Sequence, residues 1–211
     1  MKFIRQLNKM INKISFKKSR KIYFLHEWKI KTYAQDTLDG EDLSIRCRNY
    51  TYLPRAVRPN SPAAVSLDEF LELDKRTKTD KIKTVLDFYH SLPYTLDEKF
   101  DDGDDAKTVY GGLITGKLDC EDFSIGITTM LRRHGMSAHL VFIERPNPSE
   151  TSHAVACLSE DDLDNPKGEY VLRMGKRYFL IEGTSPNKVG EMNSKYRTWK
   201  KYFIDCSGVT E

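Results

Sequence analysis

The chain has 211 residues, of which 39% are apolar and 31% are charged, a composition typical of a folded globular protein rather than a disordered one. No apolar run approaches the roughly 18 residues of a membrane-spanning helix, and the N-terminus lacks the apolar core of a secretory signal. Residues 1–25 carry eight Lys or Arg and no acid, so the overall charge of +3 leaves −5 on the remainder. We therefore expect a cytoplasmic protein whose basic character belongs to its N-terminal segment.

Residues 1–26 are predicted to form a basic amphipathic helical extension. Its apolar residues recur at helical spacing and are surrounded by Lys and Arg. Such a helix can pack on its own domain, lie on an anionic membrane surface or bind an acidic partner. Nucleic acid is a less favoured partner, because no recognition motif accompanies the charge. The stripe consists of Phe3, Leu7, Met10, Ile11 and Ile14.

Residues 27–75 predict an irregular layer with short strands that packs on a core formed by residues 76–211. Within it, Ser66 and Glu69 have the spacing of a capping box, which predicts a short helix starting at Ser66. A second helix is expected over residues 81–90, where apolar residues share one face and Pro93 follows. Six acids then lie between Asp97 and Asp105. Their spacing does not fit an EF-hand, so a solvated acidic loop is favoured over a calcium site.

The segment 119–134 gives the strongest helix prediction. Asp119 is a good N-cap, Asp122 has capping-box spacing, and Gly135 suits the C-terminal end. The apolar residues on one face, which are expected to pack against Val141, Val155 and Leu180 of the sheet, are Phe123, Ile127, Met130 and Leu131. Strands are expected at 136–143, 152–158, 169–174 and 177–183, with a hairpin turn at Gly175 and Lys176.

Cys120 falls at the first position of this helix, where free backbone N–H groups and the helix dipole stabilise a thiolate. The neighbouring acids oppose that effect, so a nearby histidine base is needed if the thiol is to act as a nucleophile. His153 begins a predicted strand after a Pro-rich loop, and Glu182 ends another. If these strands pair antiparallel, His153 and Glu182 lie opposite each other. Alternation also places Cys157 on the His153 face.

Two other roles for the cysteines are open. Four widely spaced cysteines without a secretion signal are expected to be reduced thiols, although a disulfide pair is an alternative. A zinc site built from Cys120, His153 and Cys157 is a less favoured alternative.

Five segments follow one another in the order found in the transglutaminase-like cysteine peptidases of the papain-like superfamily, and residues 85–185 resemble that family. The resemblance implies an α+β fold in which a nucleophile helix packs on an antiparallel sheet. It departs from the family pattern at Glu182, where Asp is usual, and at Leu118, where Gly is common and where substrate approach is expected to change. The segments are SLPYTLD (91–97), DCEDFSI (119–125), LRRHGM (131–136), HAVACL (153–158) and YFLIEGTS (178–185).

The resemblance further implies that Cys120 is the nucleophile, His153 the base and Glu182 the third member of a catalytic triad. Acyl transfer through a thioester is expected, with water or an amine as the acceptor. The oxyanion would be held by the Cys120 backbone N–H and by Tyr94 or Tyr110. No metal or organic cofactor is expected, and the substrate would be a protein or peptide, with the acidic loop favouring a basic one.

The alternative is a catalytically silent module of the same fold that serves as a binding or scaffold domain. In that case the basic helix, residues 1–25, would dock on a membrane or a partner and carry the function. The predicted location is cytoplasmic in both cases, with a peripheral membrane position if the helix binds lipid. The sequence does not define an oligomeric state.

Overall fold

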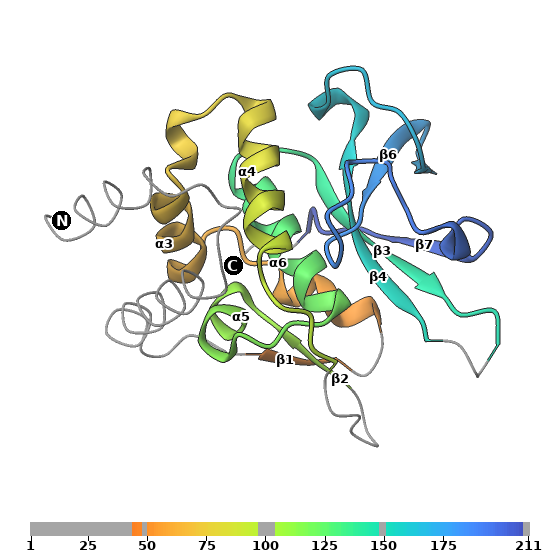
Figure 1. The fold of residues 1–211 in the computed structure, drawn as a ribbon, viewed down its shortest axis with the longest axis horizontal. Helices are drawn as coiled ribbons and strands as arrows, with labels where there is room; N and C mark the ends of the chain where they lie inside the picture. The colour runs from red at the N-terminus through yellow and green to blue at the C-terminus, as the bar shows by residue number, and fades with distance from the viewer. Residues whose placement is uncertain (1–43, 48–49, 97–103, 148–150, 209–211) are drawn as a thin grey trace, which may run out of the picture.

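Helix α6, Cys120–Arg133, lies between a five-stranded antiparallel sheet and a layer of helices in the computed structural model (Figure 1). The structure describes residues 44–47, 50–96, 104–147 and 151–208. This mixed arrangement confirms the predicted α+β class with a helix packed on an antiparallel sheet. The remaining elements are β1 (Ser44–Cys47), η1 (Tyr50–Ala56), α3 (Pro62–Leu71), η2 (Leu73–Lys75), α4 (Lys78–His90), β2 (Asp104–Lys107), α5 (Val109–Thr115), β3 (Ala138–Glu144), β4 (His153–Ser159), η3 (Glu160–Asp162), β5 (Tyr170–Arg173), β6 (Lys176–Ile181), η4 (Ser194–Tyr196) and β7 (Lys200–Ile204).

The large sheet has the strand order β5-β6-β4-β3-β7, and every neighbouring pair is antiparallel. The four predicted strands correspond to β3, β4, β5 and β6, while β7 was not predicted. Strand β4 is central and buried along its whole length. Residues Met174 and Gly175 form the β5–β6 turn with positive φ angles of 50° and 80°, so the turn lies one residue before the predicted pair.

The predicted capping of α6 is confirmed by the structure. The Asp119 side chain accepts a hydrogen bond from the backbone N–H of Asp122, and the Asp122 side chain accepts one from the N–H of Asp119. Two backbone donors at the helix start are thereby satisfied by side chains. Gly135 follows the helix with a φ of +73°, a conformation that glycine adopts without strain. The start of α6, and with it Cys120, is therefore held by local interactions.

Helix α3 begins five residues earlier than predicted, when the observed N-cap is compared with the predicted N-cap Ser66. Its N-cap is Ser61, whose hydroxyl accepts from the N–H of Ala64 at 3.3 Å, and Pro62 occupies the first turn. Proline fits that position because the N–H it lacks would have no helical partner there. Ser66 and Glu69, predicted to form a capping box, lie inside the helix instead.

The core lies on both faces of the large sheet. Phe123 and Ile127 of α6 pack with Ala156, Leu158 and other residues of the helix-facing side. Val141, Val155 and Leu180 instead belong to a separate cluster on the opposite face, so the sequence-based expectation that they contact α6 was wrong. Helix α6 packs on this face because its small side chains let the helix approach the strands closely. These side chains are Ala138, Ala154 and Ala156.

The described residues before and after position 75 share this core, since Ala64 and Leu67 of α3 belong to the same cluster as Phe123. The predicted basic extension, residues 1–26, lies outside the described residues, as does most of the acidic segment 97–105. Within the described part of the chain, no helix is both long and apolar enough to span a bilayer. Cys120, Cys157 and Cys206 are buried free thiols.

Gly126 allows α6 to pass over the ring of Tyr89 in α4, and Gly126→Ala is expected to destabilise the protein. A Cβ at this position would overlap the Tyr89 hydroxyl and ring carbons, and Tyr89 is only 3% exposed. Overpacking of this kind costs about 1–3 kcal/mol, which exceeds the ~1 kcal/mol that alanine gains over glycine in a helix. Urea denaturation should show a net loss of stability. An exposed helix change, Lys83→Ala, serves as the control, and an unchanged or raised midpoint for Gly126→Ala would contradict this packing.

Candidate active site

The Cys120 thiol lies at the N-terminus of α6, in contact with its own helix and with the start of β4. The thiol donates a hydrogen bond to Glu121 Oε2 at 2.9 Å and accepts one from the backbone N–H of Ala154. Burial raises the pKa of the thiol well above its ordinary value of 9.0, and the charges of Glu121 and Asp119 raise it further, whereas the Ala154 N–H lowers it. In the described state Cys120 is therefore a protonated thiol.

His153 and Glu182 form a buried hydrogen-bonded pair next to this thiol. His153 Nε2 lies 2.8 Å from Glu182 Oε2, while the hydroxyl and backbone N–H of Thr184 donate to Oε1 at 2.8 and 3.1 Å. Burial alone would raise the pKa of Glu182, but the hydrogen bonds from His153 and Thr184 outweigh it and leave the pKa below its ordinary 4.5. Glu182 is thus an ionised acceptor at neutral pH, and Nε2 carries the shared hydrogen.

Strand pairing explains why these two side chains meet. Strands β4 and β6 pair antiparallel with Ala156 opposite Ile181, so the start of β4 lies beside the end of β6, as the sequence predicted. The intervening strand β5 pairs with the other edge of β6 and does not separate them. His90 of α4 also contacts the backbone carbonyl of Glu182 through Nε2 at 2.9 Å, which fixes the chain at this point.

The structure brings Cys120 and His153 to adjacent positions without a hydrogen bond between them. Ala154, whose N–H contacts the thiol, directly follows His153 in β4. Because Nε2 is bound to Glu182, Nδ1 is the ring nitrogen left to accept the thiol proton. Among the described residues, Glu121 is the acceptor of that proton. The arrangement brings together a thiol at a helix N-terminus, an imidazole and a carboxylate that is hydrogen-bonded to the imidazole.

The ring of Tyr196 covers His153, a contact that sequence reasoning missed. The two rings stack at a centroid distance of 4.5 Å and an angle of 11°, and Trp199 meets Tyr196 edge-on at 5.1 Å. The Lys201 ammonium donates to the carbonyls of Tyr196, Arg197 and Trp199 at 2.9, 2.9 and 3.2 Å. This segment therefore holds the imidazole in place and limits its access to water. The cluster of aromatic residues at 196–203 is the signal that could have identified it.

The two tyrosines predicted as oxyanion donors occupy different places. Tyr94 bridges to Leu118 next to the helix start and stacks on Phe123 at 6.4 Å. Burial, followed by the charges of Cys120, Asp119 and Glu121, raises the pKa of Tyr94, so its hydroxyl stays protonated beside the thiol. Tyr110 lies in α5 and packs on the hydrophobic core cluster. The structure thus brings Tyr94, but not Tyr110, to the site.

Leu118 does not line the approach to the thiol. Its side chain is 3% exposed and belongs to the core, where it occupies the space that a Cβ on Gly112 would enter. Its backbone carbonyl accepts from the N–H of Thr95 at 2.8 Å. The residue anchors the Tyr94 segment to the start of α6, and the expected effect on substrate approach was wrong because the side chain turns inward.

The predicted zinc alternative is not supported by the geometry. Cys157 pairs with His139 of β3 and lies in the buried cluster on the far face of the sheet. In the part of the chain that the structure describes, Cys120, His153 and Cys157 are not among the side chains whose ligand atoms converge closely enough to hold a metal.

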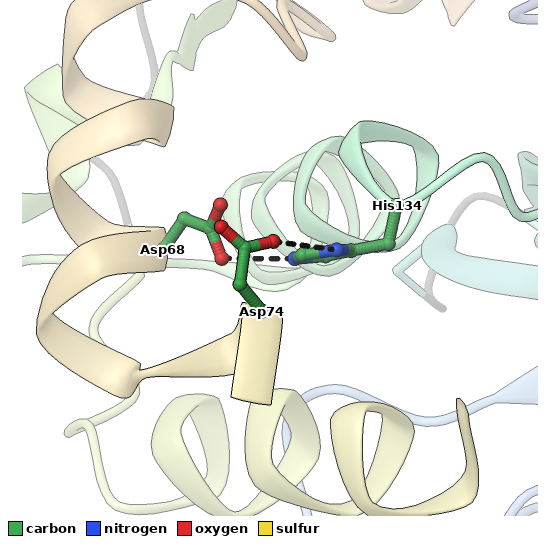
Figure 2. A group of neighbouring side chains, drawn as sticks. All are labelled: Asp68, Asp74 and His134. Carbon is green, nitrogen blue, oxygen red and sulfur yellow. Dashed lines mark hydrogen bonds and ion pairs between the residues drawn. The ribbon is translucent and has the colours of Figure 1, made fainter. Parts of the chain in front are cut away.

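One group of described side chains, Asp68, Asp74 and His134, does have converging ligand atoms. Figure 2 shows both carboxylates facing the ring of His134 at the C-terminal end of α6, with Nε2 2.9 Å from Asp68 Oδ1 and Nδ1 3.9 Å from Asp74 Oδ1. The Lys81 ammonium already contacts Nδ1 at 3.1 Å, and Arg133 Nε lies 2.9 Å from the other Asp68 oxygen. Lys81 thus occupies one ring nitrogen of His134 and Arg133 already pairs with the Asp68 carboxylate, so the group is a charge network that joins α3, α4 and α6.

Two solved structures are similar to this chain, and both are of Legionella pneumophila LapG, one of them EGTA-treated. Each is 16% identical and has a TM-score of 0.48, with 86% of this chain covered and 83% or 85% of LapG. No protein-family model and no curated protein matches the sequence. At this identity and TM-score the likeness assigns neither a family nor an activity, so a function must be argued from the site.

Proposed function

We propose that this protein is a thiol-dependent enzyme of the transglutaminase-like cysteine peptidase type, acting on amide bonds of a protein or peptide. Cys120 is the nucleophile and His153 is the general base and acid. Glu182 orients the His153 ring and stabilises its protonated form. The observation that carries the proposal is the buried His153–Glu182 hydrogen bond of 2.8 Å beside a cysteine at a helix N-terminus. A lone buried cysteine needs no such partners for packing alone.

In the proposed reaction the thiol proton passes to His153 Nδ1, and the thiolate attacks the amide carbonyl. In this proposal the backbone N–H groups of the helix N-terminus and the Tyr94 hydroxyl stabilise the oxyanion that forms. The imidazolium, held by Glu182, gives its proton to the leaving amine, and a thioester remains on Cys120. Water then produces hydrolysis, or an incoming amine produces transfer. The chemistry needs no cofactor.

The silent binding module is the second candidate, and one observation favours it. Burial and the charges of Glu121 and Asp119 raise the pKa of Cys120, whereas a competent nucleophile needs a lowered one. In that case the buried His153–Glu182 pair would stabilise the fold and have no catalytic role. The basic segment 1–25 would then be the functional part through a membrane or an acidic partner, which stays a prediction because it lies outside the described residues.

The two candidates differ in how the alkylation of Cys120 depends on pH. We expect iodoacetamide to label Cys120 faster than the buried Cys157 and Cys206, and His153→Ala to slow this labelling and move its pH profile to higher pH. Peptide mass spectrometry measures the labelling of each cysteine separately. A Tyr178→Phe variant, which changes a different residue of the same sheet, serves as the control. Equal labelling profiles with and without His153 would exclude the triad and leave the binding module.

A further inference from the structure

We infer that Glu121 is a gate on the nucleophile, which selects substrates bearing a positively charged side chain or amine next to the reacting carbonyl. This inference rests on the proposed function and assigns it a substrate class. The Glu121 carboxylate holds the Cys120 proton in the resting state, and a cationic group that pairs with the carboxylate releases that proton to His153.

The geometry singles out Glu121 among the three acids at the start of α6. Asp119 is engaged in capping, since its Oδ1 accepts from the N–H of Asp122 at 3.3 Å. Asp122 is buried and bound to the ammonium and backbone N–H of Lys107 at 2.8 and 2.7 Å. Only Glu121 accepts the thiol hydrogen, at 2.9 Å, and it is half-buried at the surface of the site.

One hydrogen on the sulfur cannot serve two acceptors at the same time. While it is bound to Glu121 it is not shared with His153 Nδ1, and the negative charge beside the sulfur opposes formation of a thiolate. The other groups that face the thiol are the Ala154 N–H, the Asp119 carboxylate and the Tyr94 hydroxyl. Burial and the Asp119 and Glu121 carboxylates oppose ionisation more strongly than the Ala154 N–H favours it, so the resting thiol is held protonated.

A lysine or arginine side chain, or a protonated amine, would reverse this balance by pairing with Glu121. The carboxylate would then accept from the cation, and the S–H would turn to His153 Nδ1. Transfer of that proton gives a thiolate and an imidazolium, with no change in total charge and no further reactant. Nucleophile activation is thereby coupled to the binding of a basic substrate, and the reaction of the thiol with neutral and acidic groups is slower.

The test compares how fast Cys120 is labelled by three methanethiosulfonates of different charge, which carry a neutral methyl, a cationic 2-aminoethyl or an anionic 2-sulfonatoethyl group. Each reagent forms a mixed disulfide and releases methanesulfinate. The rate of Cys120 labelling at pH 7 is divided by the rate at which the same reagent reacts with 2-mercaptoethanol, which corrects for the reactivity of the reagent itself. We expect the wild-type protein to favour the cationic over the anionic reagent by at least about tenfold, equal to one pKa unit of electrostatic bias. Glu121→Gln should raise the neutral-reagent rate about tenfold and abolish the preference.

Two further variants sharpen the test. Glu121→Asp keeps the charge but shortens the side chain, so it should keep the cation preference while releasing the thiol to the neutral reagent. Asp161→Asn removes an exposed acid beyond the other end of β4 and should change neither rate. If Glu121→Gln does not fold, as judged by its melting curve, the Glu121→Asp result decides.

The gate is overturned if Glu121→Gln leaves the neutral rate and the charge preference unchanged, or slows the reaction. If that happens while His153→Ala still shifts the iodoacetamide profile, the triad stands and only the gate fails. If Glu121→Gln accelerates labelling while His153→Ala has no effect, the proposed function fails, and the gate fails with it because the proton has no base to reach.

Discussion

Glu182→Gln is expected to slow acylation of Cys120 by about 10²–10⁴-fold, which is the range for loss of a positioned general base or its orienting carboxylate. Glutamine keeps the size of the side chain but replaces the acceptor of His153 Nε2 with an amide that can present a donor. The ring then adopts the other tautomer, with its hydrogen on Nδ1, and cannot accept the thiol proton. Loss of the carboxylate charge also removes the stabilisation of the imidazolium. Stopped-flow acylation by an activated ester measures the effect.

The same substitution should change the acid sensitivity of the fold. The pKa of folded Glu182 lies below its ordinary 4.5, so at acid pH the unfolded chain binds this proton more readily than the folded one. The stabilisation that Glu182 provides is therefore present above about pH 4.5 and is lost as the pH falls through the folded pKa. Glu182→Gln should flatten this part of the urea-midpoint profile, whereas Asp161→Asn should not. A rate within threefold of wild type would contradict the role assigned to Glu182.

Asp122→Asn is expected to cause the largest loss of stability, about 3–5 kcal/mol, the range for removing one partner of a buried ion pair. Asp122 is 2% exposed, and it accepts from both nitrogens of Lys107 as well as from the N–H of Asp119. Burial raises its pKa to about 6 against the opposing effect of Lys107, so at pH 7.5 it is an ionised partner of that ammonium. Asparagine leaves the Lys107 charge buried without its counter-charge.

Urea denaturation at pH 7.5 measures this loss, and a second substitution identifies its cause. Adding Lys107→Met to Asp122→Asn removes the unpaired cation and should recover part of the lost stability. Because both residues adjoin the helix start, Asp122→Asn alone should also reduce the preference of alkylation for Cys120 over the other cysteines. If the free energy of unfolding of Asp122→Asn lies within 1 kcal/mol of the wild-type value, the ion pair does not stabilise the start of α6.

The parts of the fold set by local interactions could be predicted from the sequence. The start of α6 follows from Asp119 and Asp122, which satisfy backbone donors within one turn. The meeting of His153 with Glu182 follows from antiparallel pairing of two strands with clear apolar patterns. The catalytic roles of these residues stay predictions, since geometry alone does not measure reactivity.

Features that depend on tertiary contacts could not be predicted in this way. Alternation separates the two faces of β4 but does not say which one meets α6, and Val155 was assigned to the wrong face for that reason. Strand β7 is short and mostly half-exposed, so its pattern is weak. The stacking of Tyr196 on His153 depends on a loop held by Lys201, and the bond from Cys120 to Glu121 depends on a side-chain rotamer.

The most direct test of the central claim is to trap the thioester. Wild-type protein, Cys120→Ser and His153→Ala are each mixed with p-nitrophenyl acetate, quenched in acid and measured by intact-mass and peptide mass spectrometry. The account predicts that the wild type gains one acetyl group on Cys120, that hydroxylamine removes it, and that both variants lack it. Acetylation that is absent, or spread over lysines and cysteines alike in all three proteins, would contradict a Cys120–His153–Glu182 catalytic site.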